Sequence, residues 1–219
     1  MSTERAATAP PPVDRLHLAV DMPDSTSMPN AAKGRRRTAM YSCCIQALAA
    51  AGITDRRHDP FLDRGDGFAA LIQPSDSVPR TALLDTVVPR LVDLLVKYND
   101  EHPTEQLRLR AAINTGPVHN DGDGWYGESL DLTFRLLDAS QLKKRARETK
   151  SPLVLVVSDE IYSSVVRQGY DGIDPRMFRA DVRVQIAGQR YRGWSCTPVT
   201  TMNCHSPNQP HRLQLIPPS

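Results

Sequence analysis

The stretch Leu16-His-Leu-Ala-Val-Asp-Met-Pro-Asp-Ser-Thr26 contains the first element of the fold and its exit loop. Its first five residues alternate weakly in polarity and lead to Asp21, which predicts a β-strand that ends there. Pro, Ser, Thr and Asp crowd residues 21–30, and this composition predicts a loop. Residues 31–51 are rich in Ala, Arg, Met and Leu and close at Gly52, as a helix with a C-terminal glycine does. The start of the chain is therefore a strand, a loop and a helix.

Further elements follow from the same patterns. Residues 57–62 and 68–72 flank Asp63-Arg-Gly-Asp-Gly67, which predicts a β-hairpin around a Gly/Asp turn. The spacing of apolar residues predicts the remaining elements: helices over 81–98, 129–139 and 159–168, strands over 107–114 (broken at Gly116-Pro117) and 153–157, and a final hairpin of 182–186 with 190–196. This order predicts an α+β fold of ferredoxin-like type, an antiparallel sheet flanked by helices.

The length of 219 residues suits one domain. We expect a disordered N-terminal tail over 1–13, the domain over 14–198 and a C-terminal tail over 199–219. The sum of 27 Lys and Arg against 25 Asp and Glu gives a net charge of +2, which argues against nucleic-acid binding as the main role. No apolar run approaches the roughly 20 residues of a membrane span, and the start lacks the apolar core of a signal peptide, so a cytoplasmic location is expected.

Two acidic residues are candidates for chemistry. Asp21 ends a predicted strand and Asp66 lies in the predicted hairpin tip, and these two elements are neighbours in a ferredoxin-like sheet. Paired carboxylates suit divalent ions such as Mg²⁺ or Mn²⁺, completed by water and substrate phosphates. The alternative is that each Asp serves a turn or a cap. The loop after Asp21 could cradle phosphates with its backbone N–H groups, or be a plain helix entry.

Four stretches, in order along the chain, resemble motifs of class III nucleotidyl cyclases. Residues 19–26 resemble the first metal motif of this family, and Arg64-Gly-Asp-Gly-Phe68 resembles its second metal hairpin. Residues 108–118 resemble its central strand, and Tyr126-Gly-Glu-Ser-Leu-Asp-Leu-Thr-Phe-Arg135 resembles its transition-state helix. The resemblance covers residues 16–196 and implies the catalytic domain of a nucleotide cyclase.

The resemblance also implies a role for individual residues. Asp21, Asp66 and the carbonyl of Met22 would hold two divalent cations, Mn²⁺ or Mg²⁺. The backbone of Pro23, Asp24, Ser25 and Thr26 would hold the triphosphate, and Arg135 would stabilise the transition state. Arg190 and Arg192 lie near the position of the family's phosphate-binding lysine, which has no clear match here. The family's active sites form between two chains, so a homodimer is implied.

The chain departs from the family at the positions that read a purine base. These positions hold Leu62 and Gly124, whose side chains cannot hydrogen-bond a base edge, and the ribose-orienting Asn is replaced by Asp131. This pattern, with residues 36–41, 130–138 and 157–174, resembles the pyrimidine cyclases of bacterial antiphage signalling, the Pycsar cyclases. That resemblance implies that Tyr41 faces the base, that UTP is the first choice of substrate and CTP the second, and that the cyclic product activates a separate effector. The alternative for Tyr41 is packing of helix against sheet.

The basic run Lys143-Lys-Arg-Ala-Arg147 is interpreted as a solvated loop, with a patch that steers phosphates or binds nucleic acid as the alternative. Arg135 alone could be a surface arginine paired with Asp131 or Asp138. Three other functions stay open for the whole chain: a purine cyclase with a rebuilt base pocket, a catalytically silent nucleotide-binding or dimerisation module, and a palm-type transferase acting on nucleic acid. No membrane and no nucleic-acid partner is expected.

Overall fold

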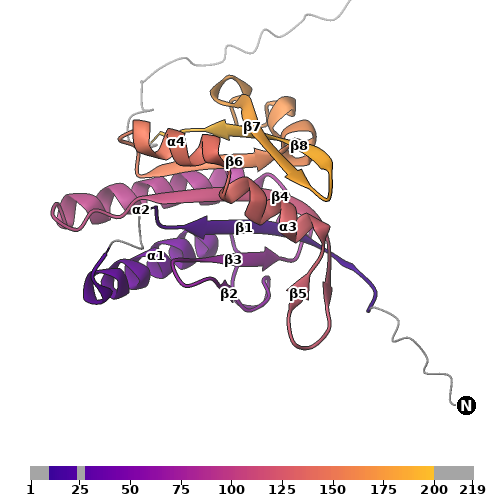
Figure 1. Cartoon of the computed structure of the whole chain (residues 1–219), viewed down its shortest axis with the longest axis horizontal. Helices are drawn as coiled ribbons and strands as arrows, with labels where there is room; N and C mark the ends of the chain where they lie inside the picture. The colour runs from indigo at the N-terminus through magenta and orange to yellow at the C-terminus, as the bar shows by residue number, and fades with distance from the viewer. Residues whose placement is uncertain (1–9, 24–27, 200–219) are drawn as a thin grey trace, which may run out of the picture.

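A sheet in which antiparallel pairing dominates runs through the centre of the molecule (Figure 1). The computed structural model describes residues 10–23 and 28–199. Within these ranges the strand order is β2-β3-β1-β4-β6-β8-β7, with β5 paired only to β4, and β4 with β6 is the one parallel pair. The strands are β1 (Val13–Asp21), β2 (Leu62–Asp63), β3 (Gly67–Ile72), β4 (Leu109–Asn120), β5 (Trp125–Tyr126), β6 (Leu153–Ser158), β7 (Arg179–Ile186) and β8 (Gln189–Cys196).

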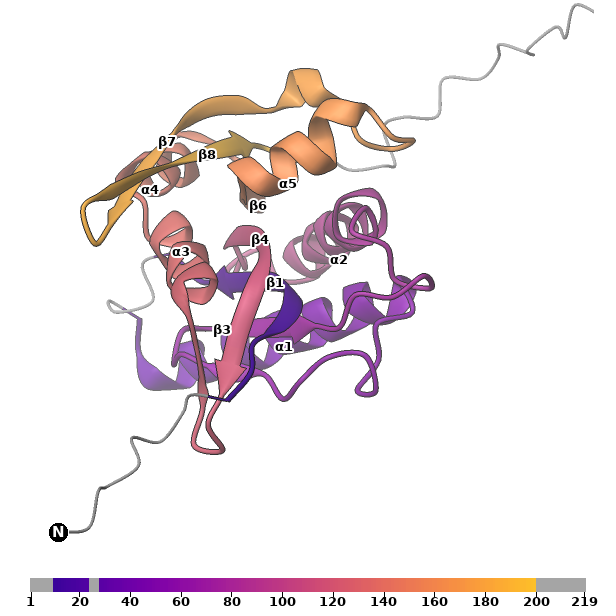
Figure 2. The same cartoon turned by 90° about the vertical axis from the view of Figure 1, so that its right-hand side faces the viewer.

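Helices cover both faces of this sheet (Figure 2). One face packs against α1 (Asn30–Ala50), α2 (Val88–Glu101) and α5 (Asp159–Ser164), and the other packs against α3 (Glu128–Leu137) and α4 (Ser140–Glu148). The alternation of side chains along a strand explains the two cores. Leu16, Leu18 and Val20 of β1 enter the larger core, whereas Ala19 enters the smaller one. Short helical turns complete the chain: η2 (Leu83–Val87), η3 (Val166–Gln168) and η4 (Pro175–Met177).

The predicted α+β fold is confirmed, with local corrections. β1 begins at Val13, one residue inside the expected tail. The predicted strand over 57–62 is mostly wrong, because only Leu62 and Asp63 pair with β3 and His58 makes an isolated bridge to Ile72. The predicted helix over 81–98 begins with a π-helical turn, and its α-helical part runs over Val88–Glu101.

The predicted break at Gly116-Pro117 is also wrong, since β4 runs through it. Pro117 can stay in the strand because it lies between two pairing regions. The pairing of β4 with β6 ends at Ile113, and its pairing with β5 begins at His119. On the opposite edge β1 continues alongside, with Asp14 facing Pro117. On the edge of β4 away from β1, no described strand pairs with Pro117, so the missing N–H of the proline costs no ladder hydrogen bond there.

The interpretation of residues 143–147 as a loop is wrong, because they belong to the helix α4. Its apolar signal is short: Leu142 and Ala146, four residues apart, are its buried residues. These two side chains dock on the smaller core beside β6, which gives the polar helix its stability.

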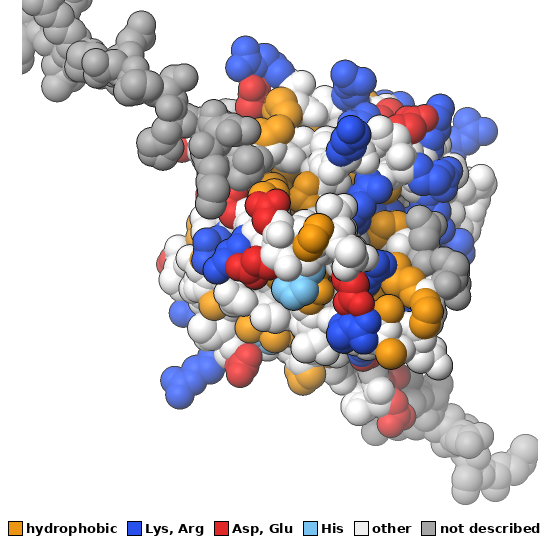
Figure 3. Space-filling model, turned by 90° about the vertical axis from the view of Figure 1, so that its left-hand side faces the viewer, with side chains coloured by type: hydrophobic (Ala, Val, Ile, Leu, Met, Phe, Trp, Pro, Cys, Tyr) orange, Lys and Arg blue, Asp and Glu red, His pale blue; other side chains and the backbone are white. Residues whose placement is uncertain are grey.

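None of the helices in the described ranges is both long enough and apolar enough to cross a membrane. On the face shown in Figure 3, Lys and Arg side chains are interspersed with Asp and Glu. This mixed surface agrees with the small net charge of the sequence.

Candidate active site

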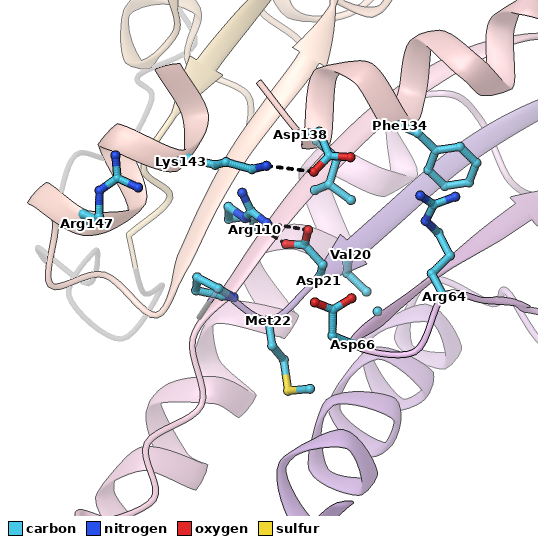
Figure 4. Close-up of a pocket in the computed structure, with 13 residues that line it drawn as sticks. Val20, Asp21, Met22, Arg64, Asp66, Arg110, Phe134, Asp138, Lys143 and Arg147 are labelled. Atoms are coloured by element: carbon cyan, nitrogen blue, oxygen red, sulfur yellow. Dashed lines mark hydrogen bonds and ion pairs between the residues drawn. The ribbon is translucent and has the colours of Figure 1, made fainter. Parts of the chain in front are cut away.

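The ends of β1 and β3 bring Asp21 and Asp66 together, as the sequence predicts. Asp21 is the last residue of β1 and pairs with Gly67, and the Met22 N–H donates to the Asp66 carbonyl at 3.0 Å. Only glycine fits at position 67, because a Cβ there would lie 2.1 Å from the Val20 carbonyl oxygen. This close approach places both carboxylates on one cavity of about 360 Å³ (Figure 4).

Arg110 of β4 lies against the same carboxylate. Its Nε donates to Asp21 Oδ1 at 2.9 Å and its Nη2 donates to Oδ2 at 2.6 Å, in a buried, bidentate ion pair. Burial raises the pKa of Asp21 to about 6, against the opposing effect of Arg110, and the charges of Asp66 and Asp138 raise it further. Sequence reasoning missed Arg110, although it stands in the stretch that resembles the cyclase central strand.

Three more cations line this cavity. Arg64, in the hairpin turn, stacks its guanidinium over the Phe134 ring at 3.8 Å. Lys143 and Arg147 come from α4, and the Lys143 ammonium lies 3.0 Å from Asp138 Oδ1. With Arg110, the cavity therefore combines three carboxylates with four cations, a setting suited to a polyanion bound together with metal ions.

The donor set around Asp21 fits a divalent cation that is shared with a substrate. Carboxylate oxygens are hard ligands, which Mg²⁺ and Mn²⁺ prefer. Among the described residues, no cluster of three or more His, Cys, Asp or Glu side chains could hold a metal by itself. Two carboxylates at a polar cavity suit ions whose remaining ligands are water and phosphate. Asp21 and Asp66, with the backbone of Met22, would hold such ions, and their role as ligands stays a prediction.

Arg135 and Asp131 lie on α3 and line a second hollow of about 400 Å³. Arg64, Phe134 and Asp138 line both hollows, so the two adjoin. Within the part of the chain that the structure describes, Arg135 makes no ion pair, neither with Asp131 nor with Asp138. Its exposed guanidinium is therefore available to a molecule outside the chain.

The residues that concern the base lie around the hairpin. Leu62 of β2 packs with the smaller core, and Gly124 lies in the turn before β5, where its N–H donates to Asp121. The Tyr41 ring stacks on Phe68 with centroids 4.6 Å apart, and its hydroxyl lies 3.3 Å from Asp63 Oδ2. Tyr41 is not among the residues that line the cavity of Asp21, so its predicted contact with a base stays a prediction.

The remaining predicted phosphate ligands are spread out. Pro23 lines the cavity, whereas Asp24, Ser25 and Thr26 lie outside the described residues. Arg190 and Arg192 line a different hollow, on the β7–β8 hairpin together with Arg183. Within one chain, the structure therefore does not bring these two arginines to Asp21 and Asp66.

Comparison with solved structures identifies this architecture. The adenylate/guanylate cyclase/hydrolase from Silicibacter pomeroyi superposes with a TM-score of 0.59 at 16% identity, over 86% of this chain and 99% of that one. The guanylyl cyclase Cya2 superposes with a TM-score of 0.57 at 14% identity, over 90% of this chain and 98% of that one. The adenylyl cyclase CyaB from P. aeruginosa superposes with a TM-score of 0.58 at 14% identity, over 86% of this chain and 95% of that one.

The chain has the cyclase fold. No family model matches the sequence, and no curated protein matches it. At identities this low the likeness establishes the fold and leaves the activity to be argued from the site. The cyclase fold covers most of the chain and almost the full length of each of these three structures.

Proposed function

We propose that this chain is a nucleotide cyclase that works as a homodimer. The observation that carries the proposal is the position of Asp21 and Asp66, at the ends of the neighbouring strands β1 and β3 on one cavity of a cyclase fold. Asp21 neutralises the buried Arg110, but that ion pair does not account for a second carboxylate, Asp66, on the same cavity. Desolvation even disfavours the charged form of Asp21, as its raised pKa indicates. A bound cation would reverse that cost.

In the proposed reaction, the ribose 3′-oxygen of a nucleoside triphosphate forms a bond to the α-phosphorus. The bond from the α-phosphorus to the bridging oxygen breaks, diphosphate leaves with that electron pair, and the hydroxyl proton is released. Divalent cations held by Asp21 and Asp66 would acidify the hydroxyl and neutralise the leaving group. Arg135 would place fixed positive charge where negative charge develops, a contribution of about 3–4 kcal/mol for one such donor.

Arg135 is not among the residues that line the cavity of the paired carboxylates, which is consistent with a site completed by a second chain. Arg135 lines the hollow on α3, and the paired carboxylates line the neighbouring one. In the proposed dimer, Arg135 of one chain completes the cavity of the other, and two-fold symmetry creates two equivalent sites. The exposed and unpaired guanidinium of Arg135 is consistent with this arrangement.

We infer a pyrimidine substrate, UTP in the first place and CTP in the second. The absence of hydrogen-bonding side chains at Leu62 and Gly124 supports this choice, because a purine edge buried there would stay unpaired. The resemblance to the Pycsar cyclases further supports a messenger made in antiphage defence and read by a separate effector.

The test is turnover by the purified chain with Mn²⁺ or Mg²⁺ and each of ATP, GTP, CTP and UTP, with products resolved by mass and chromatography. Cyclic UMP as the main product is expected. Cyclic CMP would keep the pyrimidine inference and change the base, whereas cyclic AMP or cyclic GMP would overturn it. No cyclic product from any nucleotide under these conditions would overturn the proposed activity and favour a silent nucleotide-binding module.

A further inference from the structure

We propose that α4 supplies the binding subsite for the terminal phosphates of the nucleotide, through Lys143 and Arg147. This inference rests on the proposed function, since it concerns the same cavity. It assigns to α4 the positive charge that neither Arg190 nor Arg192 brings to the carboxylates within one chain.

The placement of α4 carries the first step. Leu142 and Ala146 are buried and fix the rotation of the helix on the sheet. Lys143 and Arg147, each one position further along, then share a neighbouring face, because residues four apart in a helix are adjacent. Both line the cavity of Asp21 and Asp66 (Figure 4).

The other two cations of the basic run are engaged elsewhere. Arg145 donates to Asp181 of β7, and Lys144 pairs with Glu148 of its own helix at 3.8 Å. Arg147, in contrast, forms no hydrogen bond or ion pair with any residue that the structure describes. The helix therefore places Lys143 and Arg147 at the cavity, whereas Lys144 and Arg145 form ion pairs outside it.

The Lys143 side chain is already oriented toward the cavity. Its ammonium lies 3.0 Å from Asp138, next to the pair of Asp21 and Arg110 (Figure 4). An ammonium has three donors, so this contact leaves two for phosphate oxygens. Asp138 therefore acts as a positioning residue for Lys143.

The charge of the cavity points to the same ligand. Arg110 is committed to Asp21, whereas Arg64 stacks over the Phe134 ring and keeps its N–H donors. Lys143 and Arg147 are the cations that α4 adds to the cavity for a β- or γ-phosphate. Arginine binds phosphate through a fork of N–H donors and lysine as a point charge, and both contacts are charge-assisted.

The experiment is calorimetric binding of inorganic tripolyphosphate with Mg²⁺ to the full chain. Lys143→Ala and Arg147→Ala are each expected to weaken the affinity about tenfold, the usual effect of losing one charge-assisted bond at a partly exposed site. Lys144→Ala is the matched control, one position along the same helix, and should leave the affinity unchanged. Lys143→Met keeps the aliphatic stem and replaces Lys143→Ala if the latter unfolds.

If Lys143→Ala and Arg147→Ala bind tripolyphosphate as tightly as the parent chain, the subsite is overturned. It is also overturned if Lys144→Ala loses as much affinity as they do. Failure of the parent chain to bind tripolyphosphate would overturn it too. The proposed activity is judged separately by turnover. A chain that forms cyclic nucleotide with an unchanged KM in both variants retains the activity and refutes the subsite. Lys143-dependent tripolyphosphate binding without turnover retains the subsite and refutes the activity.

Discussion

Arg110 holds Asp21 by both carboxylate oxygens, across 89 residues of sequence, at the point where β1 and β4 run side by side. Both side chains are nearly buried, at 8% and 12% exposure. The pair keeps a candidate metal ligand in place before any ion arrives, and Arg110 opposes the rise that burial causes in the pKa of Asp21. Removing one member of such a pair leaves the other as an uncompensated buried charge.

Arg110→Met is therefore expected to lower the free energy of unfolding by about 3 kcal/mol, as measured by urea denaturation. The double variant Asp21→Asn with Arg110→Met should recover part of the loss, because no isolated charge is then buried. Arg90→Met, at an exposed arginine on α2, is the control and should change stability little. A loss in Arg110→Met no larger than that of the control would contradict the buried pair.

Asp66→Asn should lower kcat by more than about a hundredfold, while the melting temperature changes little. The side chain lines the cavity at a hairpin turn, so its loss removes a proposed metal ligand without opening the core. Asp76→Asn, at an exposed carboxylate, is the matched control. Parent-like rates for Asp66→Asn with saturating Mn²⁺ would refute the metal role.

Mixing two inactive variants tests whether the sites are shared. Asp66→Asn and Arg135→Ala should each be inactive alone. In an equal mixture that exchanges subunits, half of the dimers are mixed, and each mixed dimer has one of its two sites intact. About a quarter of the parent activity should therefore return, by the symmetry of a two-fold dimer. If no activity returns after verified exchange, Arg135 acts within its own chain or has no such role.

Tyr41→Phe separates the hydroxyl from the ring. The stack on Phe68 survives this change, so the free energy of unfolding should fall by less than about 1 kcal/mol. If the hydroxyl serves the base, the KM for UTP should rise about tenfold. An unchanged KM would leave packing of α1 on the hairpin as the role of Tyr41.

His17 makes stability depend on pH. It is fully buried in β1, its Nδ1 lies 2.9 Å from Thr133 Oγ1, and its Nε2 has no hydrogen-bond partner among the described residues. Burial is the largest effect and lowers the pKa of His17 to about 4. The backbones of Ser129 and Gly116 act to raise this pKa, and the charge of Arg15 lowers it slightly. The unfolded chain, with a histidine pKa near 6.5, binds the proton first as the pH falls.

The stabilising effect of neutral His17 is thus complete above about pH 6.5 and is lost as the pH falls toward 4. The full loss is up to roughly 3 kcal/mol. We expect His17→Gln to remove this part of the slope when unfolding is compared between pH 7 and pH 4.5. The contributions of other titratable groups cancel when the two proteins are compared. If the free energy of unfolding depends on pH equally in the parent chain and in His17→Gln, the role of His17 is refuted.

Much of the fold is readable from local patterns. The strand that ends at Asp21, the hairpin around Asp66 and the helix of Arg135 carry strong turn, glycine and apolar signals. Two predictions differ from the structure in ways that matter: the break in β4 at Gly116-Pro117 and the loop in place of α4. In β4 the proline is tolerated because one edge is unpaired there, and α4 is a polar helix that two buried residues hold on the sheet. Neither cause is visible in a local window, since both depend on what the neighbouring strands do.

The sequence by itself determined the α+β class and the two acidic residues at a strand end and a hairpin tip. It did so because strand alternation, helix periodicity and turn residues act over short distances. Only the tertiary structure decided that Arg110 neutralises Asp21 and that Lys143 and Arg147 face the same cavity. Those relationships join segments far apart in the chain, and they arise from strand register and from the rotation of a docked helix.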